Sequence, residues 1–229
     1  MVDGDETAPG DGAFFLALAA KGKEAWNAWR RDPANKDVYV TFKGVDFSVA
    51  PRDGIDFSGF EFGDWADFSQ CKWRGGDWDQ VRGASGGPDV FKPGRACFTD
   101  ASFGDRASFE GAAFGDFAGF TGAAFGDLAT FKGATFGVYA SFAGTASFGD
   151  RASFEGAALG FGASFGAVEF RGSVSFEDAA FEDAAFEDVS FDGPIFGGIT
   201  SFASAAFRRL DLFRLGRFQR PRYLRRKVH

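Results

Sequence analysis

The side chains best suited to chemistry in this sequence are carboxylates that recur at regular spacing. Asp105, Asp127 and Asp150 follow one another at nearly equal intervals along the chain. A second acidic group repeats every five residues and comprises Glu177, Asp178, Glu182, Asp183, Glu187 and Asp188. Such rows could attract a cationic partner or a cation, although carboxylates in a straight row do not converge as the ligands of a metal cage do. Solvation of the surface and protection of strand edges explain the same residues more simply.

Groups that could form a catalytic centre are scarce in this chain. The single histidine is His229, and no Ser/His/Asp or Cys/His set and no phosphate-binding loop can be assembled around it. The two cysteines, Cys71 and Cys97, occupy different positions of the repeat described below, with Cys97 expected to face outward, so no disulfide is predicted between them. We therefore predict no enzyme activity, no cofactor and no metal site.

Aromatic residues form a second regular series. Phe117, Tyr139 and Phe161 are equally spaced and fall outside the main repeat. We predict that they form an exposed stripe along one corner of the fold. A contiguous apolar patch of this kind is often a binding site, but packing of each ring along its neighbours explains the stripe equally well.

One sequence repeat must position all of these residues. From Phe98 to Phe207, Phe or, once, Leu159 recurs every five or six residues, and a small or β-branched residue, most often Ala, stands two positions before it. This period fits neither a helix at about 3.6 residues nor a strand that alternates at about 2. Each unit must therefore be a short extended piece followed by a turn.

An internal duplication indicates how many units close one circuit. Residues 101–114 and 146–159 are identical at 13 of 14 positions, and the offset between the two copies is eight units. Eight units make two circuits of four, so the repeat predicts a four-sided solenoid with coils of about 22 residues, stacked at about 4.8 Å. The Phe rings of successive coils then stack inside the tube. The Asp row and the aromatic row fall on opposite corners.

The Ala-x-Phe-x-Gly pattern, over roughly residues 40–207, resembles that of the pentapeptide repeat family. The resemblance implies an all-β solenoid, a right-handed quadrilateral β-helix, with Phe or Leu at the central interior position. The segment GKEAWNAWR resembles the leader before the repeats of many bacterial members. The alternation of five- and six-residue steps departs from the plain family pattern.

The repeat divides the chain into four segments. Residues 1–12 are predicted to be disordered, and 13–35 to form a helical cap that carries Trp26 and Trp29 over the open end of the tube. The solenoid spans 38–207, interrupted at 79–95, where Gly and Pro favour an excursion over a regular coil without deciding between them. Residues 208–229 form a basic segment.

The distribution of charge bears on the choice of partner. The whole chain has a net charge of −7, but residues 208–229 carry +8 and residues 1–207 carry −15. The acidic body argues against direct nucleic-acid binding, whereas the basic segment could contact an anionic membrane surface. Its last basic cluster comprises Arg222, Arg225, Arg226 and Lys227. Without an apolar run that could span a bilayer or a signal peptide, the chain is predicted to be cytoplasmic.

These observations favour a non-enzymatic scaffold that binds a protein partner, as one module of a longer bacterial protein. The resemblance implies one alternative, an acidic DNA mimic that binds a type II topoisomerase such as gyrase and confers resistance to its inhibitors. Family members of that kind dimerise through a C-terminal hydrophobic segment, whereas this C-terminus is basic. A further alternative is the spacer or sensor part of a membrane-linked protein. The sequence indicates neither the partner nor the oligomeric state.

Overall fold

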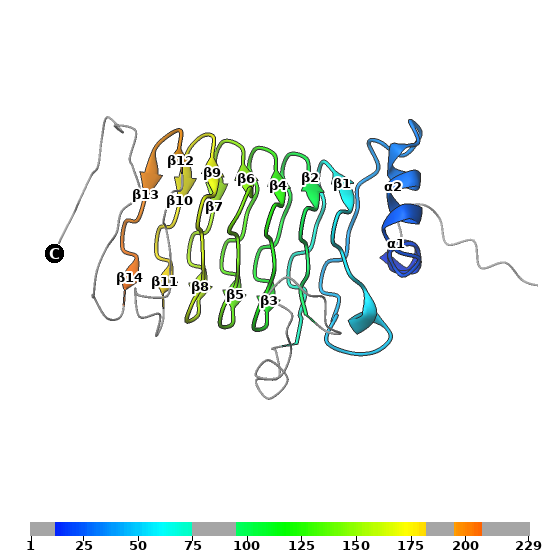
Figure 1. The fold of residues 1–229 in the computed structure, drawn as a ribbon, viewed down its shortest axis with the longest axis horizontal. Helices are drawn as coiled ribbons and strands as arrows, with labels where there is room; N and C mark the ends of the chain where they lie inside the picture. The colour runs from blue at the N-terminus through cyan, green and yellow to red at the C-terminus, as the bar shows by residue number, and fades with distance from the viewer. Residues whose placement is uncertain (1–11, 75–94, 182–194, 208–229) are drawn as a thin grey trace, which may run out of the picture.

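The computed structural model describes residues 12–74, 95–181 and 195–207, which form a solenoid of parallel strands with two helices at its N-terminal end (Figure 1). The helices are α1 (Gly12–Ala19) and α2 (Lys23–Arg31), and a short 3-10 turn covers Arg52–Gly54. The strands are β1 (Glu61–Gly63), β2 (Ser102–Phe103), β3 (Ala113–Phe114), β4 (Ala124–Phe125), β5 (Thr135–Phe136), β6 (Ser147–Phe148), β7 (Ala152–Ser153), β8 (Ala158–Leu159), β9 (Glu169–Phe170), β10 (Val174–Ser175), β11 (Ala180–Phe181), β12 (Ile195–Phe196), β13 (Thr200–Ser201) and β14 (Ala206–Phe207).

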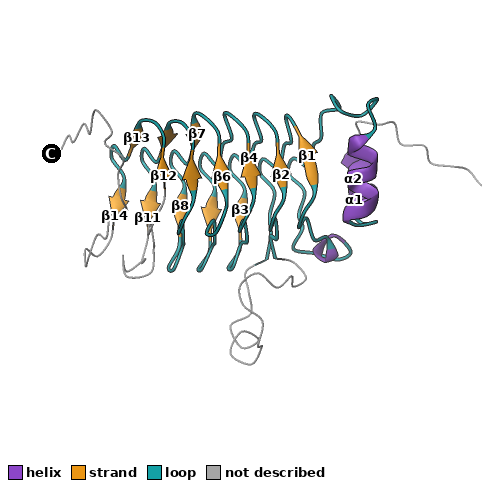
Figure 2. Cartoon of the chain, turned by 45° about the horizontal axis from the view of Figure 1, so that its top comes forward, coloured by secondary structure: helices purple, strands orange, loops and turns teal. Residues whose placement is uncertain are grey.

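The strands and bridges define four sides. One sheet has the order β1-β2-β4-β6-β9-β12, a second β14-β11-β8-β5-β3, and a third β13-β10-β7. The third side continues towards the N-terminus as single parallel bridges, and the fourth side consists of such bridges, including Gly119↔Ser141 and Ser141↔Ser164. The prediction of a four-sided β-solenoid is confirmed, and its short strands lie in rows along the tube (Figure 2).

Stacked rings fill the interior. Phe125 lies between Phe103, at 4.8 Å and 4° between ring planes, and Phe148, at 4.7 Å and 6°. Rings on adjoining sides meet edge to face, as Phe125 and Phe131 do at 5.5 Å and 78°. Both arrangements are favourable for aromatic pairs. The predicted stacking of Phe rings from successive coils is confirmed.

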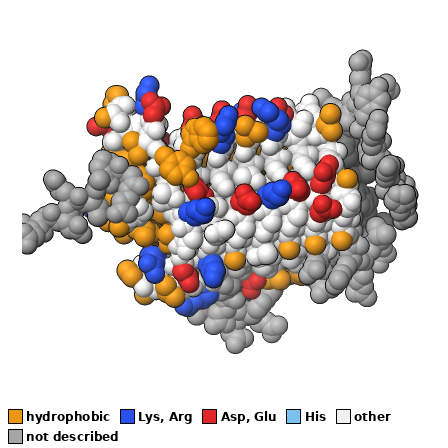
Figure 3. All heavy atoms as spheres, turned by 180° about the vertical axis from the view of Figure 1, so that it is seen from behind, with side chains coloured by type: hydrophobic (Ala, Val, Ile, Leu, Met, Phe, Trp, Pro, Cys, Tyr) orange, Lys and Arg blue, Asp and Glu red, His pale blue; other side chains and the backbone are white. Residues whose placement is uncertain are grey.

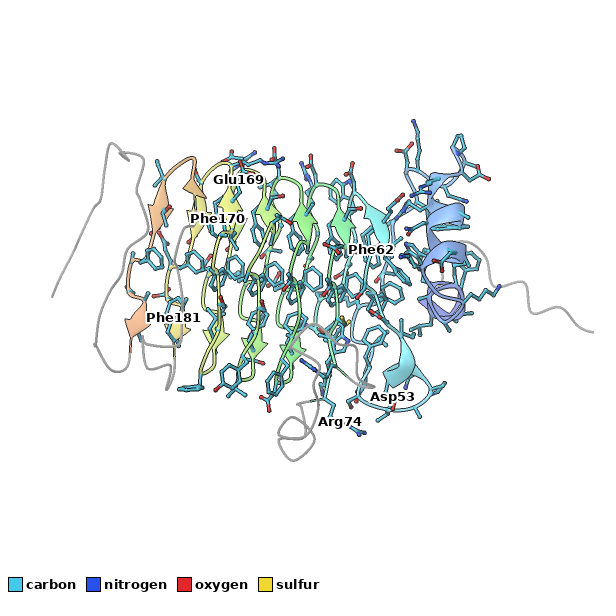
Figure 4. All side chains as sticks on the ribbon, viewed as in Figure 1. Asp53, Phe62, Arg74, Glu169, Phe170 and Phe181 are labelled. Atoms are coloured by element: carbon cyan, nitrogen blue, oxygen red, sulfur yellow. The ribbon has the colours of Figure 1, made fainter. Side chains whose placement is uncertain are left out.

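Side chains alternate between the inside and the outside because each side of the tube is a short extended segment. Figure 4 shows Phe170 pointing into the tube and its neighbour Glu169 pointing outward. The Ala two residues before each central ring is buried as well; Ala123 and Ala129, for example, are both 0% exposed. No larger side chain has room beside the rings, which explains why the repeat requires a small residue there.

The coil before residue 75 stacks directly on the coil that follows residue 94. Phe57 lies 5.1 Å from Phe98 and Trp73 lies 4.9 Å from Phe114, each pair nearly parallel. The partners in each pair are separated along the chain by almost twice the length of a regular coil. A further regular coil therefore has no place between them, and residues 75–94 lie outside the described part of the chain.

A second departure follows Phe181. Strand β9 pairs with β6 on one edge and with β12 on the other, so that Phe170 lies opposite both Phe148 and Phe196. The chain segment from Phe170 to Phe196 is longer than the segment from Phe148 to Phe170. From Phe181 to Phe196 the sequence contains three repeat steps, whereas the strand pairing moves on by only two sides of the tube. The prediction that every unit adds one side is wrong for this stretch, whose residues 182–194 are not described.

The helical cap predicted over residues 13–35 consists of two helices, α1 and α2. Gly22 separates them with a φ of 89°, a conformation that few other residues adopt without strain. Phe15 and Trp26 are both 0% exposed, and Trp26 packs against Phe42 and Phe60 of the first coils. The predicted role of this segment as a cap is confirmed.

Candidate functional site

Two opposite corners of the tube contain most of the six-residue steps and most of the candidate functional residues. At each, a non-glycine residue adopts a positive φ, for example Arg106 at 63° and Leu128 at 63° on one corner and Phe117 at 60° and Tyr139 at 58° on the other. We call the first the acidic corner, defined by Asp64, Asp105, Asp127 and Asp150, and the second the aromatic corner, defined by Phe117, Tyr139 and Phe161.

The carboxylates of the acidic corner join successive coils. Oδ1 of Asp64 accepts a hydrogen bond from the backbone N–H of Asp105 at 2.9 Å, Oδ1 of Asp105 from Asp127 at 2.8 Å, and Oδ1 of Asp127 from Asp150 at 2.8 Å. The series ends with Oδ1 of Asp150 accepting from Ser173 at 2.9 Å. This last hydrogen bond, with help from Arg151, lowers the pKa of Asp150. The predicted row of Asp residues is therefore a ladder that satisfies corner N–H groups.

The glycine before each aspartate makes this ladder possible. A Cβ on Gly149 would lie 2.3 Å from Oδ1 of Asp127 and 2.7 Å from the carbonyl carbon of Gly126. Gly126 and Gly104 are in the same position relative to the carboxylate of the coil before them. The recurring Gly-Asp pair thus provides an acceptor for the next coil and space for the carboxylate of the preceding one.

The outer row of the acidic corner mixes apolar and basic side chains. Trp65 is 50% exposed, and the guanidinium carbon of Arg106 lies 4.4 Å from the centre of its ring. Arg151 Nε lies 3.4 Å from Oδ2 of Asp150. Figure 3 shows such rows of charged side chains along the tube, separated by bands without charge. Within the described ranges, no group of three His, Cys, Asp or Glu side chains is arranged to hold a metal ion.

The repeat spacing alone did not identify the first members of this corner. Asp64 and Trp65 precede Asp105 and Arg106 by nearly two coil lengths, so a search at the spacing of a single coil does not find them. The signal was nevertheless present, since EFGDWA at 61–66 matches SFGDRA at 102–107 in its Phe-Gly-Asp core.

The rings of the aromatic corner contact one another along the tube. Phe117 and Tyr139 stack at 5.5 Å and 20°, and Tyr139 meets Phe161 edge to face at 5.4 Å and 82°. Phe117 is only 7% exposed, because the guanidinium of Arg95 lies 4.8 Å above its ring and donates a hydrogen bond to the Phe117 carbonyl oxygen at 2.8 Å. The predicted exposure of the whole stripe is therefore wrong for Phe117, whereas Tyr139 and Phe161 are half-buried.

Phe161 is also displaced from the column of the other two rings. The N–H of Phe117 donates to Val138 O, whereas that of Tyr139 donates to Phe161 O, so Phe161 corresponds to Val138. The position equivalent to Tyr139 is Gly162, with a φ of 73°, whose added Cβ would lie 2.3 Å from Cδ1 of Tyr139. The Tyr139 ring therefore lies against the bare backbone of Gly162, and the prediction of three equivalent aromatic positions is wrong.

The remaining predicted residues belong to the C-terminal part. Glu177 and Asp178 are exposed, and Oε1 of Glu177 accepts a hydrogen bond from Oγ of Ser201 in the next coil at 2.7 Å. The other predicted acidic and basic residues lie outside the described ranges: Glu182, Asp183, Glu187, Asp188, Arg222, Arg225, Arg226 and Lys227.

Both cysteines are buried free thiols. Cys71 is 0% exposed and donates to Phe42 O at 2.9 Å, and burial raises its pKa to about 12. Cys97, predicted to face outward, is only 6% exposed, with Sγ 3.1 Å from Oγ of Ser58. Burial raises the pKa of Cys97 as well. Neither thiol has the thiolate character of a nucleophile.

Comparison with known proteins gives little support from sequence. No protein-family model matches the chain, and no curated protein matches it. Among solved structures, the chain is similar to HetL, a pentapeptide repeat protein involved in heterocyst differentiation regulation from the cyanobacterium Nostoc sp. strain PCC 7120. The identity is 11%, the match covers 84% of this chain and 90% of HetL, and the TM-score is 0.18. The four-sided fold therefore rests on the pairing of this chain's own strands.

Among the residues that the structure describes, none forms a helix both long enough and apolar enough to cross a bilayer.

Proposed function

We propose that this chain is a member of the pentapeptide repeat family and a non-enzymatic scaffold that holds a protein partner on the outside of its tube. The observation that carries the proposal is the separation of roles within each coil. The interior positions are Phe and Ala almost throughout, with Leu159 and Val168 among the exceptions, whereas the corners differ from one another in charge and aromatic content. A uniform interior with a varied exterior suits a rigid element whose specificity lies on its surface.

The buried groups of the tube support a structural role. Its interior is lined by aromatic and small apolar side chains. The buried thiols of Cys71 and Cys97 have pKa values raised by burial, which makes them poor nucleophiles. Catalysis requires titratable groups that converge on a pocket, and the candidate carboxylates instead follow each other along a straight edge.

The aromatic corner is the best candidate for contact with a partner. Tyr139 and Phe161 are half-buried rings, and Tyr139 is held between Phe117 and Phe161 of the adjoining coils, so little conformational entropy would be lost when a partner packs on them. Rigid aromatic anchors of this kind are typical of interface hot spots. The cationic side chain of Arg95 borders the same corner.

Site-specific photocrosslinking in the cells that produce the protein tests this proposal. A benzophenone amino acid at position 161 should give one crosslinked protein adduct, and the same probe at position 65, on the opposite corner, should give none. The adduct should disappear when Tyr139 is changed to Ser. Equal labelling from positions 65 and 161, or no adduct from either, would contradict the proposed docking corner.

A specific observation also supports the DNA-mimic alternative. Four carboxylates follow one another on the edge of the tube through the ladder from Asp64 to Asp150. However, Arg106 and Arg151 stand in the adjoining row, and Arg151 pairs with Asp150 at 3.4 Å, which reduces the negative potential that would attract a DNA-binding groove. We expect no inhibition of gyrase supercoiling at micromolar protein. Salt-sensitive inhibition would reverse the ranking of the two functions.

A further inference from the structure

The N-terminal end of the tube shows how this protein closes a row of strand edges. In helix α2, Trp26 Nε1 donates to Glu61 O at 2.8 Å, and Asn27 both donates to Gly59 O at 2.9 Å and accepts from the N–H of Glu61 at 2.9 Å. Arg31 forms an ion pair with the Glu61 side chain. The cap therefore combines an aromatic ring over the last interior rings, polar groups on the strand edge and a cation on an acidic neighbour.

The opposite end presents the same kind of edge. Among the residues that the structure describes, strands β12, β13 and β14 are the outermost members of their sheets, and Figure 1 shows them at the end of the tube farthest from the helices. Within this last coil Ile199 is 67% exposed, and Ala203 and Ser204 are exposed as well. The outer edge of a parallel sheet readily pairs with another chain, so proteins generally cover it.

We propose that residues 208–229 of this same chain cover the C-terminal end of the tube. The segment combines apolar and basic residues, the same classes that α2 uses at the other end. Its aliphatic and Phe residues are Leu210, Leu212, Phe213, Leu215, Phe218, Leu224 and Val228. Its net charge of +8 complements a body of −15, and Glu177 and Asp178 are exposed in the coil next to the last one.

The connectivity favours this occupant over a second molecule. Residue 208 follows β14 directly, so the segment is tethered at the edge that it would cover. A short tether of this kind gives an effective concentration on the order of millimolar. A second copy of the chain, arriving end to end, would have to compete with that local concentration and would meet a body of the same negative charge.

Hydrogen exchange of the full chain, followed by mass spectrometry of its peptides, tests the proposal. In the unmodified protein the amides of 195–207 should be protected at every protein concentration. The double change Phe213→Ser and Phe218→Ser should speed their exchange on the order of ten-fold, while exchange in the inner coils 120–159 stays the same. Val49→Ser, an exposed apolar residue near the other end, is the matched control and should change nothing in 195–207.

The charge contribution has its own matched pair. Asp178 and Asp100 both adopt a positive φ, at 54° and 55°, which Asn tolerates well. Asp178→Asn should speed exchange of the last coil by about two-fold, Asp100→Asn should not, and added salt should act in the same direction as Asp178→Asn.

Four results would overturn the proposal. The first is fast exchange of 195–207 in the unmodified chain, and the second is unchanged exchange in the Phe213/Phe218 variant. The third is protection that rises with protein concentration together with a doubled mass, which would assign the edge to a second copy. The fourth is protection that requires vesicles containing phosphatidylserine, which would assign the basic segment to a membrane surface.

Discussion

The interior stacks and the aromatic corner repeat rings at the same interval, one per coil, with different results. Inside, Phe103, Phe125 and Phe148 follow one another at 4.8 and 4.7 Å with planes within 4° and 6° of parallel. On the corner, the planes of Phe117 and Tyr139 differ by 20°, and those of Tyr139 and Phe161 by 82°. An interior ring is enclosed on all sides, which fixes its orientation, whereas a corner ring packs only along the tube and against the backbone below it.

The difference shows where this fold accommodates variation in coil length. The coil from Phe142 to Phe165 is one residue longer than the coil from Phe120 to Phe142, yet both pairs of rings stack at 4.8 Å. The additional residue is absorbed at a corner, between Phe142 and Phe148, because turns can change length without moving the interior. Interior positions therefore keep their alignment while corner positions shift.

The largest expected effect separates the two sets of rings. Phe125→Ala should lower the free energy of unfolding by about 3–5 kcal/mol, since it leaves a cavity between two stacked rings. Phe161→Ala, at the half-buried end of the corner, should cost about 1 kcal/mol or less. Urea denaturation of both variants measures the difference. Equal losses would mean that the corner rings belong to the same cooperative core.

The two six-residue corners can be compared through their glycines. Gly149→Ala and Gly162→Ala should each cost about 1–3 kcal/mol, because the new Cβ meets occupied space. At Gly162 the obstacle is the Tyr139 ring, so the added change Tyr139→Ala should recover part of the loss. At Gly149 the obstacle includes the backbone of Gly126, so Asp127→Ala should recover little.

A double-mutant cycle for each pair measures this coupling by denaturation. A similar recovery of stability at both corners would show that Gly149 is required only because of the Asp127 carboxylate, and not because of the Gly126 backbone.

The same contrast explains which features could be predicted from the sequence. The spacing of Phe and the offset between the duplicated segments determine four sides and the stacking partners, because interior packing allows no slippage. Corner alignment requires the length of each coil, so the equal spacing of Phe117, Tyr139 and Phe161 misleads where one coil is longer than its neighbour. The burial of Phe117 depends on Arg95, which follows the undescribed stretch 75–94, and no repeat pattern places its side chain.

A smaller effect concerns the acceptor role of the carboxylate ladder. Asp127→Ala removes the acceptor for the N–H of Asp150 and should cost about 1 kcal/mol, whereas Asp127→Asn retains a side-chain oxygen and should cost less. Thermal unfolding of both variants makes the comparison. A loss in Asp127→Asn as large as in Asp127→Ala would indicate that charge, and not the hydrogen bond, matters at this corner.

The smallest effect is a dependence on pH at the end of the acidic corner, where Asp150 lies. The pKa of Asp150 lies below its usual value of 3.8, first because the N–H of Ser173 donates to the ionised form and further because of Arg151. A lowered pKa in the folded state means that the stabilising contribution is present above the unfolded value and is lost as the pH falls through the folded value. Asp150→Asn should therefore lose less stability than the unmodified chain between about pH 5 and 3 in urea titrations.

Val138→Asn, at the equivalent row of the aromatic corner, is the control. It adds an amide without removing a carboxylate, so its stability should change with pH as that of the unmodified chain does. If the stability of Asp150→Asn changes with pH as much as that of the unmodified chain, Asp150 makes no pH-dependent contribution.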